Sequence, residues 1–265
     1  MRSLLMANLQ SMDHLPAMER WFLTQHVDET LRTVGASLDR YLSYRAIPVP
    51  EGENPADWGY YNWRVTELWW HTSPIDLPPQ DVTQSAGATW PQEYDTCLGY
   101  PGTEASAGRW VPRAPIGGFL NRRYTNDFKG AGRTLDDGHN LRWVVAHKYP
   151  AGVDVEVADD WWVNVHAPEM CEQPGLKRFF STRLTGAASG DMVRFTELWF
   201  ERGSAWRDTV NSPDSFTRPA WASREAYPFL QPYEEFASTF LLEAPTNDFK
   251  RCRSDERSRP PYSLI

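Results

Sequence analysis

Two closely similar stretches, residues 64–70 (RVTELWW) and 194–200 (RFTELWF), decide the fold of this chain. They lie 130 residues apart, and three further pairs of segments repeat around them in the same order. Residues 21–26 recur as 161–166 at an offset of 140, residues 38–45 as 176–183 at 138, and the pentapeptide TNDFK of 125–129 as 246–250 at 121. Because the offsets fall in steps while the order is kept, the pattern indicates a duplicated unit that has lost loop residues.

Both copies predict the same first elements. Short apolar runs of strand length occur in matching order at residues 2–9, 38–49 and 66–71 and at residues 141–149, 176–184 and 196–201. Between the first two strands of the first copy, apolar residues recur at helical spacing from Pro16 until Gly35. The matching helix of the second copy has Asp159 and Asp160 in its acidic first turn and ends at Gly175.

The second copy continues with a predicted helix at residues 223–236 and a last strand at 238–243. Its order is therefore β-α-β-β-α-β, the arrangement of ferredoxin-like folds. We predict an α+β fold in which two such repeats, residues 1–130 and 131–251, form a barrel within one chain. Residues 252–265 form a tail, which is either a poorly ordered end or an arm packed on the partner in a homodimer.

The first copy departs from this order after its third strand. Residues 78–118 are rich in Pro, Gly, Ala, Ser and Thr, with Trp90 among scattered aromatic residues, and show little helical period. Long loops inside compact domains are usually functional or mobile. We expect this segment to be a lid or wall over a pocket, or alternatively a degenerate second helix.

Composition excludes several classes of protein. The 265 residues carry a net charge of −8 with no basic block before the last residues, which argues against nucleic acid or an anionic membrane as partner. No apolar run reaches the roughly 20 residues of a spanning helix, so we expect a cytoplasmic protein. The three cysteines lack a CxxC spacing, which argues against a disulfide framework or a zinc site. The 13 Trp, 11 Tyr and 12 Phe suit a pocket for an apolar or aromatic small molecule, or an aromatic-rich core.

Residues 161–170 (WWVNVHAPEM), with the strands on either side, resemble the EthD-type members of the dimeric α+β barrel superfamily. In that pattern the first helix carries an aromatic pair and then a His-Ala/Gly-Pro step. The first copy matches less well, because Val27 and Asp28 follow His26 where Ala167 and Pro168 follow His166. The resemblance implies that two ferredoxin-like units pack sheet to sheet into a barrel. Since the superfamily includes cofactor-free monooxygenases, cyclases, isomerases, dehydratases and haem enzymes, it does not name the reaction.

Histidines are the first candidates for catalysis, since imidazole titrates near neutral pH. His26 and His166 occupy matching positions, and each shares a helix face with the aromatic residue four positions earlier. Their presence in both copies favours a structural role, in which each fixes its helix on the sheet. His147 has no counterpart in the other repeat, and a function carried by one half leaves such asymmetry.

Glu67 and Glu197 are the second pair of candidates. Alternation along a strand places Glu67 on the same side as Trp69, and Glu197 on the same side as Trp199. Burial between aromatic residues raises the pKa of a carboxyl group toward a range useful for acid–base chemistry. The alternative is a salt bridge from each glutamate to the arginine of the neighbouring strand, Arg45 or Arg183.

Substrate contacts are expected from arginine and tryptophan side chains. Arginine binds a carboxylate or phenolate through two parallel hydrogen bonds, and tryptophan packs against apolar rings. We list as substrate-binding candidates Trp162, Trp199, Trp69, Arg183, Arg45 and Trp90.

These residues support two main functions. The first is a cofactor-independent lyase, isomerase or cyclase that acts on an apolar, aromatic small molecule by His/Glu proton transfer. The second is a binding or accessory protein of aromatic or ether catabolism. A weaker alternative is a haem-dependent oxidative enzyme with one axial histidine. We expect no metal and no cofactor, and we expect the pocket chiefly in the second repeat, with His166 as the leading acid/base group.

Overall fold

The computed structural model describes residues 2–9, 11–71, 116–130, 140–185, 192–212 and 215–250. The first repeat runs through β1 (Arg2–Ala7), α1 (Leu15–Trp21), a π-helical turn η2 (Phe22–His26), α2 (Val27–Val34), β2 (Leu38–Ile47), β3 (Arg64–Trp70) and β4 (Ile116–Lys129). The second repeat runs through β5 (Leu141–His147), α4 (Val155–Trp161), a π-helical turn η8 (Trp162–His166), α5 (Ala167–Cys171), β6 (Leu176–Thr185), β7 (Arg194–Phe200), α6 (Gly203–Val210) and β8 (Phe236–Leu242). A short strand, β9 (Asn247–Asp248), follows.

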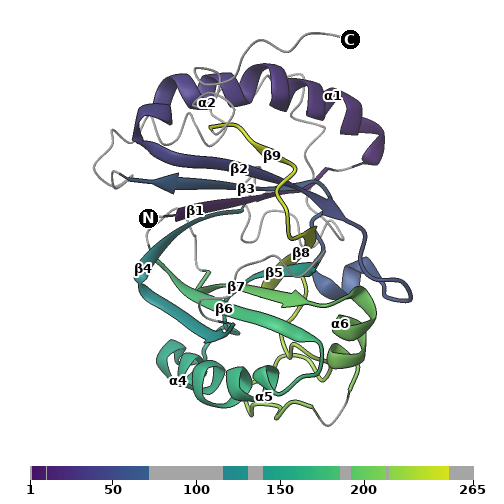
Figure 1. Ribbon diagram of the computed structural model, residues 1–265. Helices are drawn as coiled ribbons and strands as arrows, with labels where there is room; N and C mark the ends of the chain where they lie inside the picture. Colours follow the sequence, from purple (N-terminus) through teal and green to yellow (C-terminus); the bar gives the residue numbers. More distant parts are fainter. Residues whose placement is uncertain are drawn as a thin grey trace.

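The strands close into a ring. Their order is β3-β1-β4-β6-β7-β5-β8-β2, and β2 pairs with β3 to complete the circle, while β9 adds to the edge of β2. Each repeat contributes its four strands in the ferredoxin-like order, β4-β1-β3-β2 and β8-β5-β7-β6. Figure 1 shows the two curved sheets facing each other, with α1 and α2 outside one sheet and α4 and α5 outside the other. The predicted α+β barrel of two repeats within one chain is therefore confirmed.

The repeat relationship extends to the pairing register. In the first repeat, the pairing of β2 with β3 shifts between Leu38 and Arg40. In the second repeat, the pairing of β6 with β7 shifts at the matching place, between Leu176 and Arg178. A shared bulge locks both sheets into the same twist and aims the same positions into the barrel.

Local sequence explains where the helices begin and end. The Asp154 side chain accepts hydrogen bonds from the backbone N–H groups of Glu156 and Val157, so α4 begins at Val155, four residues before the predicted acidic turn. After α5, Gly175 takes a φ of +81°. A Cβ at this position would lie 2.6 Å from the Cβ of Ala205 in α6. Glycine is therefore required there by both the backbone conformation and the close approach.

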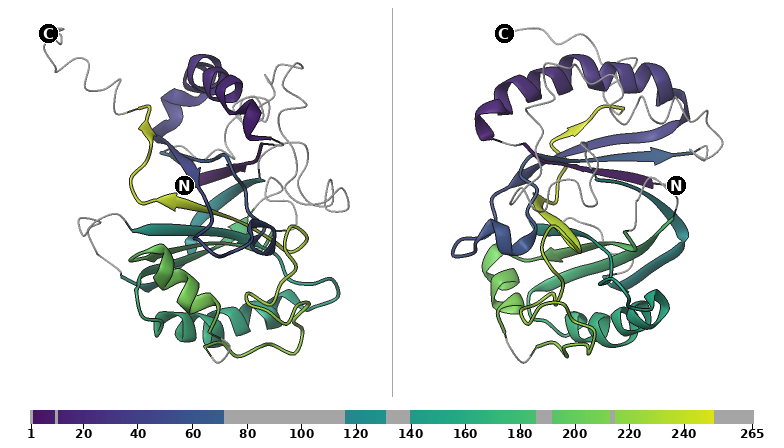
Figure 2. Two further views of the ribbon diagram at one scale, coloured as in Figure 1. Left: turned by 90° about the vertical axis from the view of Figure 1, so that its right-hand side faces the viewer. Right: turned by 180° about the vertical axis from the view of Figure 1, so that it is seen from behind.

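Apolar side chains form separate layers inside the barrel and beneath the helices. One cluster packs between the sheet of the first repeat and α1 and α2, and a second packs beneath the helices of the second repeat. A third fills one end of the barrel interior, and includes Leu4, Val65, Val144 and Phe195. The two further views in Figure 2 show the helices on the outside of the strands. Strand alternation thus separates an inner face from an outer, helix-covered face.

The predicted helix at 223–236 is wrong. The helix between β7 and β8 is α6, and residues 223–235 are irregular. Pro228 and Pro232 lack the backbone N–H that a helix interior needs, and Phe229 and Tyr233 have φ values of 70° and 62°. The apolar residues that suggested a helix instead face the core beneath α4 and α5, where Tyr227, Phe229 and Leu230 are buried.

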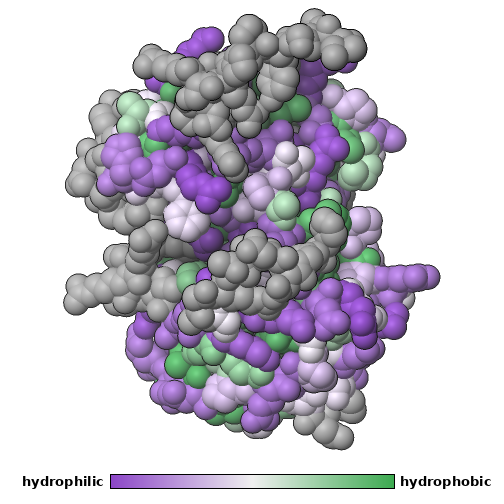
Figure 3. Space-filling model, viewed as in Figure 1, coloured by the Kyte–Doolittle hydropathy of each residue, from purple (hydrophilic) through white to green (hydrophobic). Residues whose placement is uncertain are grey.

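Part of the sequence prediction lies outside the described residues. This holds for the expected lid up to residue 115 and for the tail at 252–265, while residues 116–118 belong to β4. Within the part of the chain that the structure describes, no helix is long and apolar enough to cross a membrane. The described surface visible in Figure 3 is mostly hydrophilic, with hydrophobic residues in small scattered patches.

Candidate active site in the barrel

Two glutamates and two arginines meet inside the barrel. Glu67 on β3 and Glu197 on β7 both accept hydrogen bonds from Nη2 of Arg142 on β5, and the Arg142–Glu67 distance is 2.5 Å. Arg2 on β1 also donates to Glu197, and its Nη1 lies 3.8 Å from Glu67 Oε2. We call these four residues the central quartet. Its members come from matching strands of the two repeats, β1 and β3 in the first and β5 and β7 in the second.

Burial and pairing have opposite effects on these charges. Glu197 is 1% exposed, and burial by itself would raise the pKa of its carboxyl group. The positive charges and hydrogen bonds of Arg2 and Arg142 outweigh that effect and lower the pKa of Glu197 to about 2. Burial favours the neutral form of Arg142, but Glu67 and Glu197 raise the pKa of its guanidinium well above its usual value. Glu197 and Arg142 therefore stay charged at neutral pH.

Aromatic rings surround the quartet. The Arg142 guanidinium carbon lies 4.8 Å from the centre of the Tyr44 ring and 5.2 Å from that of Trp199. The Arg2 guanidinium carbon lies 5.3 Å from the Trp69 ring, whose Nε1 donates to Glu67 Oε2 at 3.3 Å. Rings over guanidinium planes hold these charges in fixed positions and exclude water from one side.

A cavity of about 240 Å³ adjoins the quartet. Both repeats supply its walls: Arg2, Arg40, Leu42, Tyr44, Glu67 and Trp69 from the first, and Arg142, Arg178, Phe180, Thr182, Glu197, Trp199 and Glu243 from the second. The expectation that the pocket lies chiefly in the second repeat therefore needs correction. The cavity lies between the repeats because the inner faces of both sheets close around it.

Four of the candidate residues from the sequence line this cavity, namely Glu67, Glu197, Trp69 and Trp199. Strand alternation correctly placed each glutamate on the same side as its tryptophan. Their ion-pair partners differ from the predicted ones, because Glu67 is directly opposite Leu42 on β2. Arg45 is three positions further along β2 and so faces the other side of the sheet.

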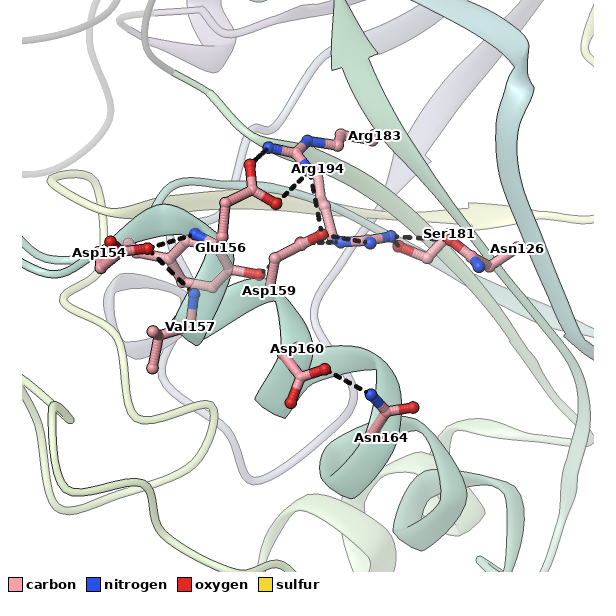
Figure 4. Close-up of polar contacts among 11 residues, drawn as sticks. Asn126, Asp154, Glu156, Val157, Asp159, Asp160, Asn164, Ser181, Arg183 and Arg194 are labelled. Atoms are coloured by element: carbon pink, nitrogen blue, oxygen red, sulfur yellow. Dashed lines mark hydrogen bonds and ion pairs between the residues drawn. The ribbon is translucent and has the colours of Figure 1, made fainter.

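The two arginines that were expected to pair with these glutamates instead bind the helices outside the barrel. Arg45 donates to Glu19 at 2.6 Å. Arg183 donates to Glu156 at 3.0 Å and lies 3.7 Å from Asp159 (Figure 4). Neither arginine lines the cavity. Both belong to the ion pairs that attach helices to sheets.

Equivalent ion pairs attach the first helix of each repeat to its sheet. Arg64 on β3 donates to Glu19 on α1 at 2.5 Å. Arg194 on β7 forms a two-pronged pair with Asp159 on α4, with the Nη2–Oδ2 distance 2.8 Å (Figure 4). Burial by itself would raise the pKa of Glu19 and of Asp159. The charges and hydrogen bonds of these arginines outweigh that effect and lower both pKa values. The arginines that begin the repeated stretches 64–70 and 194–200 therefore attach the helices to the sheets.

His166 lies between helix and sheet in the second repeat, outside the cavity walls. Its Nε2 is 2.9 Å from the Tyr227 hydroxyl, and its ring stacks on Trp162 at 4.0 Å. Burial lowers the pKa of His166 to about 3. The imidazole is therefore neutral at pH 7. It is buried, together with the Trp162 ring, between the helices and the sheet of the second repeat.

His147 lies in the same layer as His166, and His26 lies in the matching layer of the first repeat, beside Trp21 and Phe22. Neither ring nitrogen of His147 has a hydrogen-bond partner among the described residues, and its ring lies 4.2 Å from that of Trp162. Burial, helped by the charge of Arg194, lowers the pKa of His147 to about 3, and burial lowers that of His26 to about 4. The structure therefore does not bring the three histidines to the glutamates. Trp90 lies outside the described residues.

Arg2 and Arg142 are not among the site residues that the sequence predicts. The signal was present, because the offset of 140 that joins the first helices also joins these two arginines at the starts of β1 and β5. Among the described residues, no group of three His, Cys, Asp or Glu side chains is placed to hold a metal ion.

The comparison with protein families gives one match. Residues 1–102 match the family described as the chalcone isomerase N-terminal domain, which is less than half of the chain. No curated protein matches the chain. The matched residues contain β1, α1, α2, β2 and β3, and with them Glu67 and Trp69.

Solved structures with similarity to this chain include several α+β barrel proteins. An ethyl tert-butyl ether D (EthD) family protein from Bacillus halodurans has 19% identity and a TM-score of 0.25, over 29% of this chain and 75% of that one. An anthrone oxidase-like protein has 10% identity and a TM-score of 0.44, over 93% and 91%. A chlorite dismutase variant from Candidatus Nitrospira defluvii has 12% identity and a TM-score of 0.48, over 96% and 94%. The first of these proteins is a member of the family that residues 161–170 resemble.

Proposed function

We propose that this chain binds a small, planar, largely apolar molecule in the barrel cavity and moves a proton on it without a cofactor, as an isomerase or lyase. The observation that carries this proposal is the cavity, in which buried charged groups stand between aromatic walls. Its volume of about 240 Å³ lies just below the roughly 300–1,000 Å³ of pockets for drug-sized ligands, which suits a small molecule. Apolar walls with a few placed polar groups are typical of such sites.

Within the quartet, Glu67 is the better candidate for proton transfer. Glu197 pairs with two guanidinium groups, and a carboxylate with a pKa of about 2 is a weak base at neutral pH. Glu67 accepts a hydrogen bond through Oε1 from Arg142, which also donates to Glu197. Its Oε2 has looser contacts, 3.3 Å from the Trp69 indole nitrogen and 3.8 Å from Arg2. We therefore assign Glu197 to positioning the arginines and Glu67 Oε2 to the acid/base step.

The family match favours an isomerase. It covers the strands that carry Glu67 and Trp69, and its description names a chalcone isomerase. An isomerisation removes a proton from one atom of the substrate and returns one to another, so it needs no co-reactant. One carboxylate that alternates between base and acid can serve both transfers.

The alternative is a protein that binds such a molecule without turning it over. The dense pairing of Arg142 favours this alternative, since a guanidinium shared by two carboxylates and packed between two rings is rigid. The haem alternative has less support, because it needed an axial histidine. The described residues that line the cavity include no histidine to serve as that ligand.

Binding and turnover of a hydroxychalcone test the proposal. Binding is followed by quenching of tryptophan fluorescence, since Trp69 and Trp199 line the cavity, and turnover by the decay of chalcone absorbance. The Glu67→Gln variant should bind as the parent does and lose roughly 10²- to 10⁴-fold in turnover. The control variant His166→Phe should keep its turnover per folded molecule.

The outcomes distinguish the catalytic proposal from the alternative of binding without turnover. Binding without turnover by the parent protein supports the non-catalytic alternative. Full turnover by Glu67→Gln, or its loss in a folded His166→Phe, refutes the assignment of the proton step to Glu67. Absence of binding overturns the proposal for this class of ligand.

A further inference from the structure

Arg178 differs from the other arginines of the cavity in having the weakest ion pair. Among the described residues its one carboxylate neighbour is Asp127, with Nη2 and Oδ2 3.9 Å apart. Its Nε is buried and has no hydrogen-bond partner among the described residues. A guanidinium offers five N–H donors and is costly to leave unsatisfied away from water. The Nη groups, whose nearest carboxylate among the described residues lies 3.9 Å away, are therefore placed to donate to an acceptor on a ligand.

The other three arginines each have a closer carboxylate, although the buried Nε of Arg142 also lacks a hydrogen-bond partner among the described residues. Arg142 and Arg2 belong to the central quartet. Arg40, which occupies the position of Arg178 in the first repeat, lies 3.3 Å from Asp248 and has a side chain that is 52% exposed. The Arg178 side chain is 25% exposed, so water satisfies it less well.

Aromatic rings fix the plane of the Arg178 guanidinium. Its central carbon lies 5.2 Å from the centre of the Trp199 ring and 5.9 Å from that of Phe180. In the first repeat, the position of Phe180 is taken by Leu42, which has no ring to pack against Arg40. A function that uses one half of a duplicated protein leaves such a difference between the halves. Two rings this close to the guanidinium restrict its position, so its N–H groups are held ready for a planar ligand group.

The geometry points to Arg178 as the anchor for an oxyanion on the ligand, so that the cavity takes an aromatic carboxylate or phenolate. This inference rests on the binding part of the proposed function and adds the charge of the ligand. Two parallel N–H···O bonds from Arg178 would hold the oxyanion, and Trp199 and Phe180 would contact the attached ring. The pair with Asp127 is long enough to yield to a closer acceptor.

Cinnamate and its neutral amide, cinnamamide, test this inference, since they differ in charge and share one planar frame. We expect the parent protein to bind cinnamate about tenfold more tightly than cinnamamide, as charge-assisted hydrogen bonds are stronger than neutral ones. Arg178→Gln should remove this difference by weakening cinnamate alone. Unchanged cinnamamide binding shows that the cavity of the variant is intact.

Two further variants serve as controls. Lys177→Gln removes the neighbouring cation on β6, which pairs with Glu201 at 3.1 Å and does not line the cavity, and we expect it to change both affinities by less than about twofold. Arg178→Lys keeps the charge without the planar fork and should recover only part of the preference for cinnamate.

Equal affinity of the parent protein for both probes overturns the inference, as does a preference for cinnamate that survives Arg178→Gln. Failure of both probes to bind also overturns it. The proposed function is judged separately, by the hydroxychalcone and the Glu67→Gln variant, so the two can fail independently.

Discussion

The buried histidines predict a steep loss of stability between pH 7 and pH 5. Burial lowers the pKa of His147 and His166 to about 3 and that of His26 to about 4, against an ordinary value of 6.5. The unfolded chain therefore takes up protons first, so stability falls once the pH drops below 6.5 and continues to fall until the folded pKa is reached.

The magnitude follows from the distance below 6.5. Each pH unit is equivalent to 1.36 kcal/mol, so at pH 5 each histidine removes about 2 kcal/mol, and the three together about 6 kcal/mol. Folded domains are stable by roughly 5–15 kcal/mol, so this loss brings the protein close to unfolding. Ordinary carboxylates contribute little in this window, because most of their titration lies at lower pH.

Urea unfolding followed by tryptophan fluorescence at pH 7 and pH 5 measures this loss. We use His147→Phe as the variant, because neither ring nitrogen of His147 has a partner within the described chain that a phenylalanine would strand. It should lose about 2 kcal/mol less than the parent between the two pH values. Any packing cost of the larger ring is the same at both pH values and cancels.

Val145→Ala is the matched control. Val145 lies two positions from His147 on β5, is also buried and does not titrate. It should cost about 2 kcal/mol at both pH values and leave the pH dependence unchanged. A His147→Phe variant with the full pH dependence of the parent would refute the assignment of the acid sensitivity to this histidine.

Two further predictions concern stability. Arg194→Met should lower the free energy of unfolding in urea by about 3–5 kcal/mol, because it leaves the partly buried carboxylate of Asp159 without its two-pronged partner. A loss below about 1 kcal/mol would show that this pair is not needed to attach α4 to the sheet. Gly175→Ala should cost about 1–3 kcal/mol, because residue 175 has a φ of +81° and the new Cβ would lie 2.6 Å from the Ala205 Cβ. The control Gly35→Ala should change stability by less than about 1 kcal/mol, since its new Cβ would meet nothing closer than 3.4 Å. Equal effects of the two substitutions in thermal unfolding would contradict this account.

The sequence by itself determined the duplication, the strands and the sides on which their residues lie. Strand alternation has a period of two, so Glu67 with Trp69 and Glu197 with Trp199 could be assigned to one face without coordinates. The colinear repeat then predicted that both halves adopt one fold. The helix boundaries were less accurate, since Asp154 starts α4 before the acidic turn at Asp159 that was taken as its beginning.

Only the tertiary structure decided which residues meet. Arg2 and Glu197 are 195 positions apart in the chain, and ring closure between the two sheets brings them into contact. Local sequence does not encode that closure, because it depends on which strand edges pair between repeats. Local sequence also does not determine the environment of His166, since a helical histidine beside aromatic residues faces either a cavity or a core. Burial beneath the helix and the contact with Tyr227, 61 residues away, settled that the imidazole belongs to the core.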